Sequence, residues 1–354
     1  MVNYQFRNII FEGGGVKGLA YAGAMQELEK RKILKNISRA GGTSAGAINA
    51  VLFCAGYTVK ETVSELKKLD FNKFKDDSFG MLRDLNRLNR EYGWHKGNYF
   101  RNWIGRLLEN KVGSEDVNFK QLREHTGKEL FVYATNLSTG FGEVYSHEKT
   151  PNVRVTDAVR RSMSIPLFFR AIRDDRNDVF VDGGMLNNFP VKLFDREKYL
   201  FNKKLADRIP KYYREENKTF LRSHPNSSPY VFNTETLGFR LDTSKEIGMF
   251  RDGQEPQHHR IDSFLDYAVR MVKSLISFQD NQHLHSDDWH RTIYIDSLDV
   301  DTTEFDLSED QKKRLIKSGK DATSNYFDWW DDTKNDVAMN HPKSTRYTKK
   351  DPNN

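Results

Sequence analysis

The sequence has little cysteine and no long apolar run. Cys54 is the single cysteine among 354 residues, so a framework of intramolecular disulfides is excluded, and its apolar neighbours predict a buried, unreactive thiol. Mean hydropathy is −0.76, and no stretch approaches the roughly eighteen apolar residues of a membrane-spanning helix. The N-terminal residues also lack the apolar core of a secretory signal. We therefore expect a polar cytoplasmic protein, with peripheral contact with membranes left open.

Neither sign of charge dominates the chain. Lys and Arg number 56 and Asp and Glu number 50, which gives a net charge of +6 and a pI near 9.0. This excess is too small and too scattered to indicate binding to a nucleic acid polymer, but it suits contact with anionic lipid. A chain of this length can bury one large core or two modest ones.

The chain is organised around residues 9–57, whose pattern predicts strand, glycine turn, helix, strand, sharp turn and helix. The first strand ends at Phe11, and Gly13–Gly15 follow it after one residue. Successive glycines allow backbone conformations that a Cβ would forbid, and they leave N–H groups pointing outward. A helix is predicted to begin near Lys17.

The second turn carries the pattern G-x-S-x-G of a nucleophile elbow, from Gly42 to Gly46. That chemistry requires a serine on a strained strand-to-helix turn with small neighbours, a requirement that Gly42, Ala45 and Gly46 meet around Ser44. The next helix would place its positive end beside Ser44, where an oxyanion would form. The pattern alone is equally compatible with a structural turn, but the glycine turn one helix earlier favours a catalytic interpretation.

Three other interpretations of the glycine turn fit less well. A dinucleotide fingerprint matches Gly13, Gly15 and Gly18 in form, but the next strand lacks the acidic residue that would hold a ribose. A phosphate-binding P-loop would need Lys-Ser or Lys-Thr after its last glycine, and neither is present. In an α/β-hydrolase the elbow normally follows several strands, whereas Ser44 follows one or two.

A third motif completes the set. The apolar strand over residues 179–181 is followed by Asp182, Gly183 and Gly184, which is how a catalytic carboxylate would be delivered to a sheet edge. With GGGVKG at residues 13–18 and GTSAG at residues 42–46, the chain resembles the patatin-like phospholipases from about residue 6 to about residue 195, and more faintly to about residue 325. Glu12 and Lys17 stand where that family commonly has Asp and Arg, and both keep the charge.

The resemblance implies a fold and a mechanism. The fold would be a three-layer α/β structure with a central, mostly parallel sheet and helices on both faces. Ser44 would attack a lipid ester, Asp182 would take its proton directly, and N–H groups of Gly13, Gly14 and Gly15 would hold the oxyanion. No metal or cofactor is expected, and the partner would be a phospholipid or a membrane surface.

The resemblance leaves alternatives open. An acyl-carrier transacylase or a carboxylesterase could use the same elbow, although the transacylase normally has His where Thr43 stands. Some bacterial relatives are defence phospholipases that cyclic nucleotides switch on, and the sequence neither requires nor excludes such a small-molecule activator. Head-group preference is also open.

The rest of the chain predicts one domain over residues 6–327, with a polar and flexible tail over 328–354. Residues 196–260 are rich in Lys, Arg and Pro, and we expect an insertion, lid or regulatory segment with little regular structure. The other expected elements are helices over 58–69, 99–108, 156–164, 261–278 and 308–327, and strands over 130–137, 143–146 and 292–295.

Three polar or aromatic groups allow two interpretations each. Arg160 and Arg161 could face a phosphate or, as we favour, water. Three histidines have a loosely metal-like spacing, but a surface position is favoured: His283, His285 and His290. Aromatic and basic residues alternate between Phe71 and Trp103, typical either of a core helix, which we favour, or of a flap on anionic lipid.

Overall fold

The computed structural model describes residues 4–76, 90–207, 209–243, 258, 260–282 and 286–332. Its centre is an eight-stranded sheet. Seven strands follow the order β10-β9-β1-β2-β4-β8-β7, and the eighth, β5, also pairs with β4. The strands are β1 (Asn8–Phe11), β2 (Arg39–Thr43), β4 (Glu129–Asn136), β5 (Phe141–Ser146), β7 (Ile172–Arg173), β8 (Val179–Asp182), β9 (Thr236–Asp242) and β10 (Thr292–Asp296). A separate two-stranded sheet pairs β3 (Gly93–His95) with β6 (Leu167–Phe169).

The sheet is mostly parallel, as predicted. Strands β10, β9, β1, β2 and β4 pair with their neighbours in parallel, whereas β5, β8 and β7 join at one side by antiparallel pairing. Strand β1 lies inside the parallel part, and all four of its residues are buried. The carboxyl ends of parallel strands meet at one edge, so the turns after β1 and β2 are brought together there.

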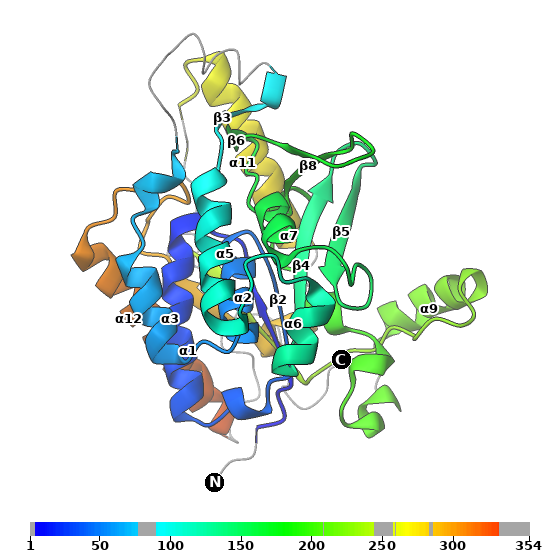
Figure 1. Ribbon diagram of the computed structural model, residues 1–354. Coiled ribbons are helices and arrows are strands. Elements are labelled where there is room, and N and C mark those ends of the chain that lie inside the picture. The colour runs from blue at the N-terminus through cyan, green and yellow to red at the C-terminus, as the bar shows by residue number, and fades with distance from the viewer. Residues whose placement is uncertain are drawn as a thin grey trace.

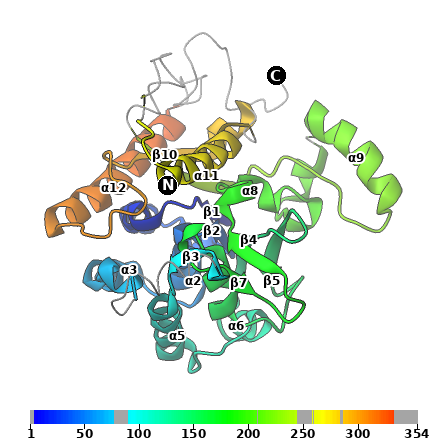
Figure 2. The same cartoon turned by 90° about the horizontal axis from the view of Figure 1, so that it is seen from above.

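Helices cover the sheet on both faces (Figures 1 and 2). The larger core joins one face of the sheet to the long helices, whereas a smaller cluster on the other face is built from Ile10, Phe131 and residues 189–199. The helices are α1 (Ala20–Lys30), α2 (Ala45–Cys54), α3 (Val59–Lys68), α5 (Asn98–Val112), α6 (Phe119–Thr126), α7 (Val155–Ser162), α8 (Gly184–Asn187), α9 (Lys211–Ser223), α11 (Phe264–Gln282) and α12 (Glu309–Asp331). The predicted three-layer α/β architecture is therefore confirmed.

Local sequence signals set several helix ends. Thr58 and Glu61 form a reciprocal capping box at the start of α3, and Ser308 and Gln311 form another at the start of α12. Helix α12 packs lengthwise on α1, where Gly23 and Gly319 allow the two backbones to touch. Cys54 ends α2 fully buried, and burial raises the pKa of its thiol to about 12, as expected for an unreactive side chain.

The expectation of little regular structure over residues 196–260 is wrong. Helix α9 projects from the body of the molecule (Figure 1), and β9 lies inside the sheet between β1 and β10 with all seven residues buried. Sequence pattern hides this strand because it contains Gly238 and the charged residues Arg240 and Asp242, which pair with each other at 2.9 Å in the interior.

Helix α12 ends four residues later than predicted, at Asp331. Trp329 is buried against Tyr326, and Asp328 and Asp331 both accept hydrogen bonds from Arg31 on α1. The predicted tail over 328–354 therefore begins inside a helix, and its residues 333–354 lie outside the described part of the chain.

Candidate active site

Ser44 occupies the predicted elbow between β2 and α2. Its backbone has φ 53° and ψ −125°, a conformation that a non-glycine residue adopts only when its surroundings impose it. A Cβ at Gly42 would lie 2.5 Å from the carbonyl carbon of Gly46, and one at Gly46 would lie 2.3 Å from Phe11 O. The two glycines therefore let α2 begin directly against β1, and Ser44 is held in the sharp turn that a nucleophile requires.

The glycine turn after β1 lies beside this elbow. A Cβ built on Gly13 would lie 3.2 Å from Ser44 Cβ, and one on Gly18 would lie 3.0 Å from Ala45 Cβ. The predicted role of Gly13 as an oxyanion donor does not fit its geometry, because its N–H donates to Asn188 O at 3.0 Å. Gly14 and Gly15 remain the candidate donors of this turn.

Asp182 ends β8 on the neighbouring part of the sheet. Its N–H donates to Ser164 O at 2.9 Å, and its Oδ1 accepts the N–H of Gly184 at 2.8 Å. The other carboxylate oxygen, Oδ2, is buried and receives no hydrogen bond within the described residues. Gly183 fits closely against Tyr133 of β4 and Thr43 of β2, which holds the end of β8 near the elbow.

Burial gives Asp182 an unusual affinity for protons. Removal from water raises the pKa of its carboxyl to about 7, while the nearby Ser44 hydroxyl and the Gly184 N–H act in the opposite direction. A carboxylate with such a pKa can accept a proton from a hydroxyl far more readily than an exposed aspartate can. The structure therefore brings Ser44, Asp182 and the glycine turn together at the carboxyl edge of the sheet.

Two residues of the segment that ends α7 position Ser44. Ser162 Oγ accepts the Ser44 N–H at 2.8 Å and donates to Tyr133 O at 2.6 Å, which ties the elbow to β4. The Ser44 hydroxyl donates to the sulfur of Met163 at 3.3 Å. Because the Ser44 N–H is engaged in this way, it is not available to bind an oxyanion.

A further link between the motifs was not predicted from the sequence. Asn188 is buried, and its Nδ2 donates to Gly13 O at 3.2 Å and to Glu12 Oε1 at 3.4 Å. It joins the glycine turn to the segment that follows Asp182. In the sequence, the one indication that Asn188 belongs to the site is that it follows Gly184 by only four residues. Glu12 is itself held by the Leu241 N–H, so β9 also supports the turn.

The interpretation of Arg160 as solvated is wrong. Its guanidinium is buried and donates to Ser164 Oγ at 2.7 Å, to Lys96 O at 2.6 Å and to Arg170 O at 3.2 Å. Arg160 thereby links the residues that follow β3 and β6 to Ser164, whose carbonyl accepts the Asp182 N–H. Arg161 is half-buried and lies over the ring of Phe180.

The remaining ambiguous side chains are mostly structural. The aromatic residues Phe71, Phe74, Phe100 and Trp103 are buried, which confirms the favoured core interpretation for them, and residues 77–89 of that segment lie outside the described part. His290 is buried at 8% exposure, so its predicted surface position is wrong. His283 and His285 lie outside the described residues.

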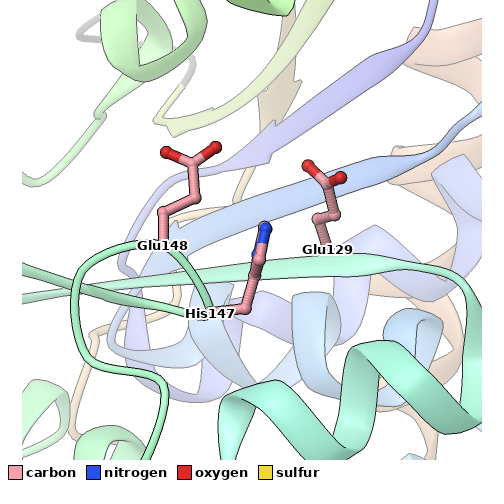
Figure 3. A group of neighbouring side chains, drawn as sticks. All are labelled: Glu129, His147 and Glu148. Atoms are coloured by element: carbon pink, nitrogen blue, oxygen red, sulfur yellow. The ribbon is translucent and has the colours of Figure 1, made fainter.

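One group of possible metal ligands occurs in the described residues: Glu129, His147 and Glu148 (Figure 3). Glu129 already pairs with Arg39 at 2.8 Å, and Glu148 accepts hydrogen bonds from Lys198 and Tyr199. Glu129 begins β4, at the opposite end of the sheet from Ser44. We assign no metal to this group, because neighbouring cations already neutralise both carboxylates.

None of the described helices combines the length and the apolar composition needed to cross a membrane.

Comparison with known proteins gives consistent matches. The family model described as patatin-like phospholipase matches residues 9–195. The chain is 29% identical over 334 residues to the uncharacterized protein YqhO of Bacillus subtilis, covering 91% of this chain and 98% of YqhO. It is 29% identical over 204 residues to a probable lipid hydrolase of invertebrate iridescent virus 6, covering 58% of this chain and 68% of that protein. The crystal structure of VipD from Legionella pneumophila has the same fold, with a TM-score of 0.58 at 17% identity over 92% of this chain and 67% of VipD.

Proposed function

The chain belongs to the patatin-like phospholipase family, and from this premise we propose that it hydrolyses acyl esters of phospholipids or lysophospholipids through an acyl-enzyme on Ser44. The observation that carries the proposal is the strained Ser44 next to an Asp182 whose pKa is raised to about 7. A buried carboxylate of that basicity can serve as the only general base.

The reaction takes place in two proton-balanced halves. Ser44 Oγ attacks the ester carbonyl carbon while its proton passes to Asp182, and the tetrahedral intermediate then expels the alcohol oxygen, which takes that proton. A water molecule then gives its proton to Asp182 and attacks the acyl carbon. The fatty acid leaves, and Ser44 regains its proton from Asp182.

The oxyanion of each intermediate would be held by the N–H groups of Gly14 and Gly15. Gly13 contributes by its small size, because a side chain there would collide with Asn188 Oδ1 and crowd Ser44. Loss of one oxyanion donor typically lowers turnover by about 10²–10³. The glycine turn therefore matters nearly as much as Ser44 and Asp182.

Hydrolysis is favoured over acyl transfer to a carrier. The position before the nucleophile holds Thr43, whose hydroxyl donates to Asn187 O at 2.9 Å and so serves the packing of the elbow. A carrier transacylase would normally place a histidine there.

A direct test is labelling with a fluorophosphonate probe, combined with mass spectrometry of a panel of phospholipids and lysophospholipids. We expect stoichiometric labelling at Ser44 and release of free fatty acid, both lost in Ser44→Ala. Ser114→Ala, which changes an exposed serine, is the matched control and should behave like the wild type. Labelling at another serine, or acyl transfer without free fatty acid, would contradict the proposal.

A further inference from the structure

Helix α11 exposes large apolar side chains along one line. Phe264 is 84% exposed, Tyr267 52%, Met271 50% and Leu275 45%. Their spacing of three and four residues places them on one side of the helix. We call these four residues the α11 apolar stripe.

The apolar sector of α11 is wider than its contact with the fold. Ala268, Val269, Val272 and Ile276 are half-buried and form the adjoining sector of the helix, which faces the protein. A surface helix normally packs on the protein through one such sector, so the stripe is not needed to hold α11 in place. Contiguous exposed apolar side chains of this kind mark an interaction surface.

The stripe lies near the candidate active site. Helix α11 packs against α8, and α8 begins two residues after Asp182 (Figure 2). Other exposed large apolar residues lie at the same edge of the sheet. Leu137 directly follows β4 and is 51% exposed, and Phe141, 73% exposed, begins β5 across the turn. Phe201, 72% exposed, lies at the opposite edge, where its N–H bonds to the Glu235 carboxylate just before β9.

Two of the three described Lys and Arg residues on α11 and its N-terminal approach pair with acids. Arg260 pairs with Asp262 at 2.9 Å, and Lys273 pairs with Asp301 at 2.8 Å. The partner of the stripe is therefore apolar rather than a strongly charged surface. The net charge of +6 on the whole chain gives a weak general attraction to anionic head groups.

We propose that the α11 apolar stripe inserts into the surface of a phospholipid bilayer and docks the active-site edge of the sheet on it. This inference rests on the proposed function, because the acyl ester that Ser44 would attack resides in such a bilayer. Ser44 is only 3% exposed, so the acyl ester of a bilayer lipid has to pass from the bilayer into a buried site. Docking of this edge shortens that path and keeps the acyl chain out of water.

Sedimentation with phosphatidylcholine vesicles tests the docking step without catalysis, and Ser44→Ala serves as the parent protein. The double change Phe264→Gln and Leu275→Gln should reduce vesicle partitioning by at least about tenfold. Each change replaces an apolar side chain that the bilayer would bury with a polar one. Raising the salt concentration should change partitioning of the parent little, because phosphatidylcholine has no net charge and the inserting side chains are apolar.

Two matched control variants distinguish docking through the stripe from non-specific hydrophobic binding to vesicles. Phe201→Gln removes a phenylalanine of similar exposure at the opposite edge, and Ser274→Gln changes an exposed polar position of α11. Both should bind vesicles like the parent. With Ser44 restored, the double variant should hydrolyse a short soluble ester at the wild-type rate while losing activity on vesicles.

Four outcomes would overturn the docking proposal: unchanged vesicle binding by the double variant, an equal loss with Phe201→Gln, an equal loss of activity on the soluble ester, or a stripe-dependent dimer that binds no vesicles. Failure of the proposed function is distinguishable from these results. In that case the wild type would not hydrolyse the soluble ester, whereas vesicle binding would still depend on the stripe.

Discussion

Burial gives Asp182 the basicity that an exposed aspartate lacks. An exposed aspartate carboxyl has a pKa near 3.8, so at neutral pH it has little tendency to accept a proton from a hydroxyl. The interior around β8 raises the pKa of Asp182 to about 7. The same site also keeps Ser44 in a strained backbone conformation. The buried carboxylate and this strain both lower the stability of the fold, and both lie at the candidate active site.

The raised pKa of Asp182 predicts the pH dependence of activity. Asp182 must be ionised to accept a proton, so kcat/KM should be low at pH 5, rise through pH 7 and level off above it. A stopped assay with a soluble short-chain ester in buffers of constant ionic strength would measure this profile. A midpoint near pH 4 would show that burial does not tune this carboxyl.

The same shift predicts that Asp182 costs stability. Between the ordinary pKa of 3.8 and the folded value of about 7, the unfolded chain loses a proton that the folded protein keeps, so this group lowers stability as pH rises. Asp182→Asn removes the charge and can still accept the Gly184 N–H. It should abolish hydrolysis yet be more stable than the wild type, with the gain in unfolding free energy growing by about 2–3 kcal/mol from pH 5 to pH 8.

Urea denaturation of both proteins at the two pH values would measure this gain. A variant that is less stable than the wild type at pH 8 would contradict the account. So would a gain that does not change with pH.

Among the elements, the contact between α1 and α12 depends on the absence of two side chains. A Cβ on Gly23 would lie 1.7 Å from Ile316 O, and one on Gly319 would lie 1.8 Å from Ala20 O. The helices therefore meet backbone to backbone. This packing connects the beginning of the chain to its last described helix.

Gly23→Ala should reverse the usual effect of such a change. In an ordinary helix, alanine stabilises by about 1 kcal/mol relative to glycine. Here the added methyl group must push α12 away, and we expect a loss of at least about 2 kcal/mol, visible as a lower Tm. Gly105→Ala in α5 is the control, because its Cβ would meet side chains rather than backbone, with Glu115 at 3.2 Å and Thr156 at 3.8 Å. Similar Tm values for the two variants would refute close packing as the cause.

Elements and site residues with local signals could be predicted from the sequence. The elbow, the glycine turn and the end of β8 depend on glycines at fixed offsets, and the capped helices begin where their capping boxes stand. Strand β9 could not be predicted, because its buried Arg240 and Asp242 satisfy each other only after folding. The roles of Arg160 and Asn188 depend likewise on carbonyl groups far away in the sequence.

At the scale of the whole molecule, residues 9–195 carry every predicted site motif but do not complete the sheet. Strands β9 and β10 and helix α12 come from the remainder of the chain. The Leu241 N–H bonds to Glu12 at the glycine turn, so the later segment also supports the site directly. The sheet and its carboxyl edge are therefore one unit, built from described residues between 8 and 331.

The placement of β9 between β1 and β10 has a consequence for synthesis on the ribosome. One edge of β1 can pair with β2 soon after residue 43 emerges, but the other edge has no partner until residue 242 has been made. At about 5–20 residues per second, this interval lasts roughly 10–40 s. Throughout it, the nascent chain presents an unpaired apolar strand edge, which is the feature that chaperones bind and that promotes aggregation.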